Sequence, residues 1–132
     1  MRISTAVSCT AAGNPFGDAM NGIRKYVVSA TLKSTSAWRN STLIKGQVVE
    51  EVRKLKEQTG KDILIDGSSV LLRTLIENDL VDKYVLHVYP LVLGGGKRLF
   101  PEGKRLNLKL NQSIPLPTGV VFQQYESVLM KE

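Results

Sequence analysis

The sequence predicts an α/β fold that is organised around one strand–turn–helix unit beginning at residue 61. Residues 62–65 form a short apolar run rich in β-branched side chains, as expected of a buried parallel strand. Gly67 ends that strand, and the hydroxyl of Ser68 or Ser69 can cap a helix that begins there. The helix has one apolar face, spaced i, i+1, i+4 and i+5: Leu71, Leu72, Leu75 and Ile76.

A second strand is predicted over residues 84–89, where the sequence alternates between two faces and completes a β-α-β unit. The free N–H groups at the first turn of such a unit, together with the helix dipole, attract an anion, most often a phosphate. A phosphate-bearing ligand at Gly67, Ser68 and Ser69 is therefore one hypothesis. The other hypothesis is that this turn has a purely structural role and binds no ligand.

The residues before this unit predict further strands and a second long helix. Residues 2–7 are compatible with a short strand and residues 15–21 with one helical turn, whereas 31–40 are polar and predict a loop. Residues 25–29 and 42–44 predict two more strands. Residues 47–59 predict an amphipathic helix with a favourable Glu50–Lys54 pair and an apolar face made of Val48, Val49, Val52 and Leu55.

The residues after the unit predict a glycine-hinged loop and two antiparallel strands. The loop contains Gly94, Gly95 and Gly96 followed by Lys97. The strands are expected over residues 106–110 and 120–125, separated by a turn that contains Pro115, Pro117 and Gly119.

The composition is that of one globular domain over residues 1–132, with 42% hydrophobic and 23% charged residues. No apolar run approaches the ~20 residues of a membrane span, and we expect no signal peptide. Cys9 is the only cysteine, which favours a reducing cytoplasm. His87 is the only histidine, so we expect no metal site, and we assign this residue to packing.

The net charge of +6 is compatible with nucleic acid or with an anionic small molecule. One local concentration of basic residues stands out: Lys97, Arg98, Lys104, Arg105 and Lys109. No RNP motif, zinc-finger spacing or helix-turn-helix pattern accompanies it, so a solvated basic loop is the simpler interpretation. A P-loop is excluded because Leu91 and Arg98 stand where its glycine and its Ser or Thr are required. The G-x-G-x-x-G fingerprint of Rossmann domains is also absent.

Three strings resemble the dihydrofolate-reductase-like family, related to the reductase domain of the bacterial riboflavin-biosynthesis deaminase-reductase. They are KYVVSATL, then W-x-N-S-T-L-I-K-G, then KDILIDGSSVLLRTLIENDLVDKYVLHVYPLVLGGGKRLF. The resemblance covers about residues 15–125. It implies a three-layer α/β/α fold with a central mixed, mostly parallel sheet, shortened at the N-terminus. It also implies NADPH as hydride donor and a pterin-like or ribosylaminopyrimidine-like substrate.

The resemblance also implies where the cofactor binds. Ser29, Ala30 and Thr31 occupy the place that receives the adenosine end of NADPH. Several family members have arginine at the position of Ala30, and Lys33 is the residue here that can replace its charge. Gly67, Ser68, Ser69 and Val70 match the pyrophosphate cradle, with Asp66 beside them and expected to face away. No catalytic residue is assigned.

Three hypotheses of function remain open. The first is an NADPH-dependent reductase of a small molecule. The second is an inactive cofactor-binding or structural remnant of the family, because only residues 1–14 stand where the family has a strand, a helix, a second strand and a second phosphate-binding turn. The third is a basic nucleic-acid-binding module.

The same departure leads to an expectation about assembly. A missing strand leaves residues 25–29 and 62–65 without a partner between them, and such edges pair readily with other chains. The two strands can close on each other, residues 1–7 can replace the missing strand, or a second copy can supply one. The sequence favours a homodimer, with no membrane association.

Overall fold

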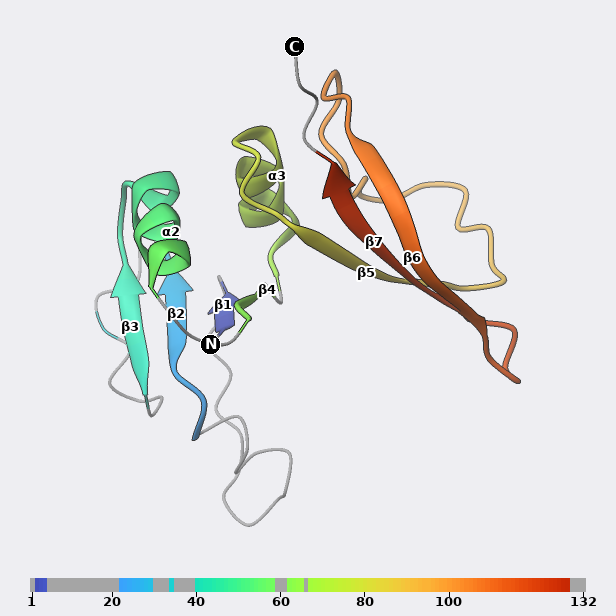
Figure 1. Ribbon diagram of the computed structural model, residues 1–132, viewed down its shortest axis with the longest axis horizontal. Helices are drawn as coiled ribbons and strands as arrows, with labels where there is room; N and C mark the ends of the chain where they lie inside the picture. The colour runs from blue at the N-terminus through green and yellow to red at the C-terminus, as the bar shows by residue number, and fades with distance from the viewer. Residues whose placement is uncertain are drawn as a thin grey trace. The chain divides into compact units, whose positions relative to one another are not determined.

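The computed structural model describes residues 2–4, 22–29, 34, 40–58, 62–65 and 67–128. The chain forms two compact units, residues 1–74 and 75–132, and each is described by itself. The first unit contains β1 (Arg2–Ser4), β2 (Lys25–Val28), β3 (Ser41–Ile44), α2 (Val48–Glu57) and β4 (Leu64–Ile65). Helix α3 (Ser69–Glu77) leads into the second unit, which contains β5 (Lys83–Val88), β6 (Asn107–Pro115) and β7 (Val121–Val128) (Figure 1).

The first unit is built on a four-stranded parallel sheet with the order β3-β2-β1-β4. β1 lies between β2 and β4, and Ile3 is in register with Tyr26 on one side and with Ile65 on the other. The predicted strand near the N-terminus is thus confirmed over Arg2–Ser4, and it fills the position between the two strands that lacked a partner. Of the three ways of completing the sheet, the structure takes the internal one, so the assembly argument based on this gap no longer applies. The homodimer stays a prediction.

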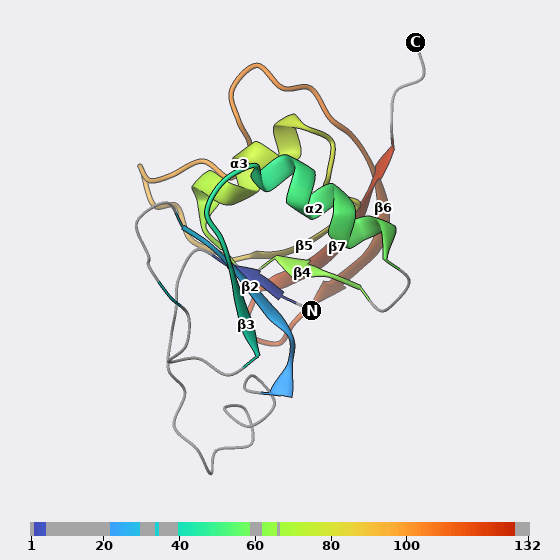
Figure 2. The same ribbon diagram turned by 90° about the vertical axis from the view of Figure 1, so that its left-hand side faces the viewer.

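Helix α2 lies on one side of the parallel strands (Figure 2). Its inward residues Val52 and Leu55 are buried, as are Val27 of β2 and Ile44 of β3, which confirms the predicted apolar face. The predicted Glu50–Lys54 pair is wrong. Glu50 instead pairs with Arg53 at 3.2 Å and Glu51 with Lys54 at 3.5 Å, both at i, i+3 spacing. The side chains are exposed, so these pairs add little stability.

Helix α3 is closed at both ends by its own residues. The Leu71 N–H donates to Ser68 Oγ at 3.4 Å, which makes Ser68 the N-cap, as the sequence predicts. At the other end, Leu80 N–H donates to Leu75 O at 2.9 Å and Asp79 N–H to Ile76 O at 3.1 Å. This is the Schellman pattern of hydrogen bonds, with Asp79 at φ 54° in the left-handed position usually held by glycine.

The second unit is built on an antiparallel sheet with the order β5-β7-β6. β6 and β7 are joined by the predicted turn, in which Leu116 N–H donates to Val120 O and Gly119 N–H to Leu116 O. Tyr84 on β5 is buried and packs against Phe100, with ring centroids 5.6 Å apart. Lys104 pairs with Asp79 at 3.0 Å, which ties the loop before β6 to the end of α3.

Two expectations about the central unit need correction. β4 covers only residues 64 and 65, and Leu64 is 56% exposed, so this strand is parallel as predicted but not buried. β5 pairs antiparallel with β7, and the described pairings put β4 and β5 in different sheets, whereas a β-α-β unit implies parallel partners. Apolar periodicity shows that a segment is a strand, but the partner is chosen by strands distant in sequence. The mixed α/β class itself is confirmed.

Several predicted features lie outside the described residues: the helical turn at 15–21, most of the loop at 31–40 with Trp38, and Asp66.

Burial and the nearby carboxylates of Asp79 and Asp82 raise the pKa of Tyr84 above its ordinary value of 10.0. The unfolded chain therefore loses this proton at a lower pH than the folded protein does. It follows that the contribution of Tyr84 to stability is complete below pH 10 and decreases as the pH rises from 10 through the folded pKa. We expect the free energy of unfolding of the Tyr84→Phe variant to decrease less steeply above pH 10 than that of the wild type. Urea titrations between about pH 8 and pH 11 measure this. Parallel curves for both proteins over the whole range would contradict it.

Removal of the α3 N-cap should destabilise the protein. Ser68→Ala leaves the Leu71 N–H without its side-chain acceptor, and we expect a loss of about 1 kcal/mol in the free energy of unfolding. Ser69→Ala is the matched control, because Ser69 lies one position inside the helix and has no capping role. Equal urea midpoints for Ser68→Ala and Ser69→Ala would show that the cap does not stabilise α3.

Candidate functional site

The carboxyl ends of the four parallel strands meet at one edge of the sheet. β1 ends at Ser4, β2 is followed by Ser29, and β3 is followed by Lys45. β4 leads to Gly67 and the start of α3. Ligands of open parallel sheets bind outside the carboxyl ends of the strands. The candidate site is therefore this edge, and it contains Ser29 and residues 67–70, which the sequence assigns to a cofactor.

Ser29 lies at the end of β2, where its N–H donates to Ile44 O at 3.1 Å. This bond holds the ends of β2 and β3 together and positions the backbone that follows Ser29. Ser29 itself is half-buried. Ala30 and Thr31, the other two residues of the predicted adenosine site, lie outside the described residues, as does Lys33.

Gly67, Ser68, Ser69 and Val70 form the turn into α3 and its first residues. Gly67 has φ +129°, a conformation that favours glycine, and its peptide bond to Ser68 is cis. A Cβ built on Gly67 meets no heavy atom within 4 Å, so the turn is open on that side. Ser69 and Val70 belong to the first turn, whose N–H groups have no acceptor within the helix. Since Ser68 already satisfies Leu71, the amides of Ser69 and Val70 and the helix dipole remain available for an anion.

The strand order sets the distance between the two segments. Ser29 follows β2 and Gly67 follows β4, and β1 alone lies between these strands. Two strand spacings correspond to roughly 10 Å. The open turn and the first amides of α3 suit a pyrophosphate, and Ser29 lies within the reach of an extended dinucleotide bound there. The residues present thus fit a phosphate-rich cofactor.

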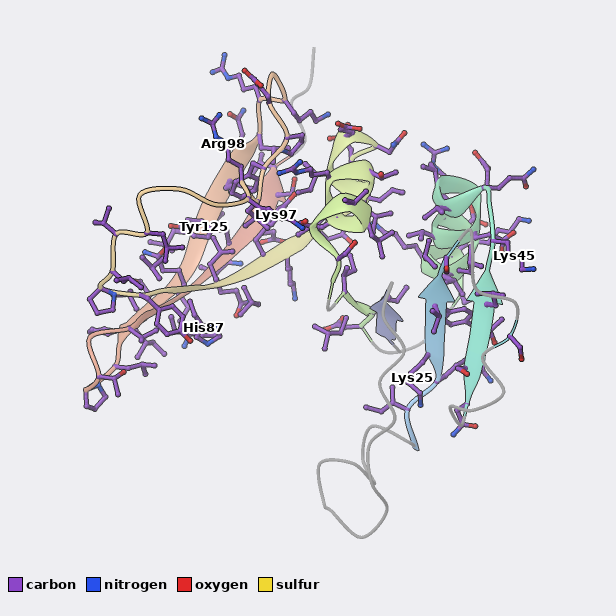
Figure 3. All side chains as sticks on the ribbon, turned by 180° about the vertical axis from the view of Figure 1, so that it is seen from behind. Lys25, Lys45, His87, Lys97, Arg98 and Tyr125 are labelled. Carbon is purple, nitrogen blue, oxygen red and sulfur yellow. The ribbon has the colours of Figure 1, made fainter. Side chains whose placement is uncertain are left out.

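Lys45 is a residue of this edge that the sequence analysis did not single out. It directly follows β3, is exposed, and lies toward the opposite end of the sheet from Lys25, which begins β2 (Figure 3). The signal in the sequence is its place immediately after the strand predicted over residues 42–44. To assign Lys45 to the site, one must know that β2 and β3 end side by side, with Val28 in register with Ile44. An exposed ammonium group here adds positive charge next to Ser29.

The described residues that directly follow parallel strands are Ser29 and Lys45, and neither is a carboxylate or a histidine. Asp66 follows β4 in the sequence and lies outside the described residues. His87 is exposed on β5 and makes an edge contact with Phe122, with ring centroids 5.4 Å apart. The part of the chain that the structure describes contains no group of three His, Cys, Asp or Glu residues suited to a metal. None of its helices is both long and apolar enough to span a membrane.

The basic cluster of the sequence lies in the second unit and is partly neutralised. Lys104 pairs with Asp79, and Lys109 is in register with Glu126 across β6 and β7. Lys97 and Arg98 follow a glycine loop that is exposed, with Gly94 and Gly96 at positive φ. This arrangement agrees with a solvated basic loop.

Comparison with known proteins agrees with the fold. A curated relative, the uncharacterized protein YyaP of Bacillus subtilis, is 40% identical over 99 residues, which are 74% of this chain and 52% of YyaP. The chain thus spans about half the length of that relative. Among solved structures, a "putative riboflavin biosynthesis protein" from Shewanella sp. PV-4 superposes with a TM-score of 0.71 at 20% identity, over 97% of this chain and 73% of that one.

A pyrimidine reductase-like protein from Corynebacterium diphtheriae superposes with a TM-score of 0.59 at 15% identity, over 80% of this chain and 50% of that one. These likenesses establish the fold. At the level of sequence, the model of the RibD C-terminal domain family matches residues 5–122. The chain therefore belongs to the RibD C-terminal domain family, the reductase-domain family that its motifs resemble.

Proposed function

We propose that this protein is an NADPH-dependent reductase that transfers a hydride to a pterin-like or ribosylaminopyrimidine-like small molecule. The observation that carries the proposal is the carboxyl edge of the parallel sheet, where an open turn and the first amides of α3 lie about two strands from Ser29. Family membership over residues 5–122 supports a reductase. The names of the solved relatives, a riboflavin biosynthesis protein and a pyrimidine reductase-like protein, support the substrate class.

Each part of the edge has its own task in this proposal. The amides of Ser69 and Val70 receive the pyrophosphate, because α3 directs its positive end toward that turn. The backbone after Ser29, with Ala30 and Thr31, receives the adenosine end. Lys45 contributes a positive charge that favours a cofactor with three phosphates. Bound NADPH supplies the hydride, and the protein's part is to hold it in place and to limit the access of water.

The decisive experiment is a fluorescence titration with NADPH, followed by NADPH oxidation with a panel of pterins and ribosylaminopyrimidines. Saturable binding and oxidation of NADPH with at least one compound would support the reductase. Binding without oxidation across the panel would favour the inactive cofactor-binding remnant. A folded protein that does not bind NADPH at all would contradict both.

Val70→Glu tests the pyrophosphate cradle without harming the helix. Val70 is 68% exposed, so little packing is lost, and a carboxylate in the first turn of a helix is favourable to folding. The same carboxylate repels phosphates, so we expect NADPH affinity to fall at least tenfold, about 1.4 kcal/mol, with unchanged or higher thermal stability. Val70→Gln is the matched control without charge. If both variants bind NADPH alike, the pyrophosphate does not lie at the start of α3.

His87→Gln tests the assignment of the only histidine to packing. Its ring contacts Phe122 on the neighbouring strand β7, with ring centroids 5.4 Å apart. We expect turnover within about threefold of the wild type, a difference of less than 1 kcal/mol in activation free energy. A hundredfold lower turnover with unchanged stability would show that His87 takes part in the reaction.

A further inference from the structure

Lys45 lies at the carboxyl edge of the parallel sheet, in the short connection between β3 and α2. The strands and the helix around it all belong to the first unit. β3 is an outer strand of the sheet and pairs with β2, with Val28 in register with Ile44. The Ser29 N–H donates to Ile44 O at 3.1 Å, so the peptide groups next to Lys45 and Ser29 are joined directly. The Lys45 side chain therefore starts about one strand spacing, ~4.8 Å, from the end of β2.

The helix that follows Lys45 does not neutralise its charge. Glu50 and Glu51, in the first turn of α2, are the described carboxylates nearest to Lys45 in the sequence. Glu50 pairs with Arg53 at 3.2 Å and Glu51 pairs with Lys54 at 3.5 Å, so both carboxylates are engaged along their own helix.

The ammonium group of Lys45 is accessible. Lys45 is exposed, makes no ion pair with a described carboxylate, and extends into solvent beside β3 (Figure 3). Its flexible four-carbon stem is longer than one strand spacing. The charged group can therefore turn toward an anion that is bound above the end of β2.

The backbone next to Lys45 is open to a ligand and adds to the positive potential. A Cβ built on Gly46 meets no heavy atom within 4 Å. Gln47, the N-cap of α2, makes no side-chain hydrogen bond to the helix, so the N–H groups of the first turn keep their partial positive charge. These amides strengthen the field at this edge, and Lys45 supplies the full charge.

The distribution of charge along the chain agrees with an anionic ligand in the first unit. Eleven of the 18 Lys and Arg residues lie in residues 1–74, together with six of the 12 Asp and Glu residues. Nearly all of the net charge of +6 thus belongs to this unit, and such a field attracts a polyanion. Of the two described residues that directly follow parallel strands, Ser29 and Lys45, only Lys45 is a cation.

We propose that Lys45 binds the 2′-phosphate on the adenosine ribose of the cofactor and thereby makes the protein select NADPH over NADH. This inference rests on the proposed function and assigns a specificity-determining residue to the same site. NADPH and NADH differ only in this phosphate, so the residue that contacts it sets the preference. The pyrophosphate lies at the start of α3, after β4, and the adenosine end lies at Ser29, after β2. The strand order then puts β3 and Lys45 on the far side of the adenosine from the pyrophosphate.

Lys33 is the rival for this role, because the sequence analysis names it as a charge near the adenosine end. It lies outside the described residues, so the experiment compares the two lysines directly. Lys54→Gln is the control for the loss of one positive charge, because Lys54 is exposed and pairs with Glu51 within α2.

The first test is isothermal titration of the full chain with NADPH and with NADH. The wild type should bind NADPH more tightly. Lys45→Gln should lower NADPH affinity roughly tenfold, because a charged hydrogen bond to the phosphate is lost. The same variant should keep its NADH affinity within about twofold, since NADH has no group at that position. Lys45→Glu should reverse the preference through repulsion, whereas Lys33→Gln and Lys54→Gln should preserve it.

The second test isolates the phosphate with cofactor fragments that contain no nicotinamide. The wild type should bind 2′,5′-ADP more tightly than 5′-ADP, and Lys45→Gln should bind the two within about twofold of each other. Because the contact is exposed, the preference of the wild type should decrease as the salt concentration rises from about 0.02 M to 0.3 M. In Lys45→Gln the ratio of the two affinities should depend much less on salt.

Three results would overturn the proposal: equal affinity of the wild type for NADPH and NADH, an unchanged preference in Lys45→Gln, or a preference that Lys33→Gln abolishes and Lys45→Gln preserves. The two proposals fail in different ways. If NADPH binds with the expected preference but is never oxidised, the assignment of Lys45 is supported and only the reductase activity is contradicted. If neither cofactor nor either fragment binds, both proposals are wrong.

Discussion

The hydrogen bonds on both sides of β1 hold the parallel sheet together. This strand has three residues, yet it is the partner of β2 on one side and of β4 on the other. Without it, β4 would not be paired with any described strand, and the start of α3 would have no defined distance from the end of β2. The geometry of the candidate site, with Ser29 and Gly67 at one edge, therefore depends on backbone bonds made by residues 2–4.

The two ends of helix α3 have different roles: the C-terminus is capped, and the N-terminus keeps amides for a ligand. Its C-terminus is closed by the Schellman bonds, in which Asp79 N–H donates to Ile76 O and Leu80 N–H to Leu75 O. At its N-terminus the Ser68 hydroxyl accepts a hydrogen bond from the Leu71 N–H, and the N–H groups of Ser69 and Val70 have no acceptor within the helix. The cap stabilises the helix, and the remaining amides give its first turn the positive character that suits phosphates. Both properties come from the short sequence Gly67-Ser68-Ser69-Val70.

The two edge strands of the second unit, β5 and β6, differ in the residues that they carry at the edge. β6 is the longer strand, and it carries a bulge, a lysine and a terminal proline, all of which oppose association. β5 is shorter and lacks the bulge and the proline, and the chain after it is apolar and exposed. The sequence could not identify which strand would lie at the edge, because a run such as 83–88 is equally suited to a central position.

The sequence by itself predicted most of the strands, helices α2 and α3, and the serine cap of α3. Local signals were sufficient for this: the β-branched residues of β2, the alternation in β6 and β7, the apolar stripe of α2, and the serine after Gly67. It also indicated the family and the turn at Gly67 as a phosphate site. The tertiary structure alone decided that β1 enters between β2 and β4, that β5 pairs with β7, and that Lys45 joins Ser29 at one edge. The physical reason is that strand pairing joins residues far apart in the chain through backbone groups that every residue possesses, so side-chain patterns do not specify the partner.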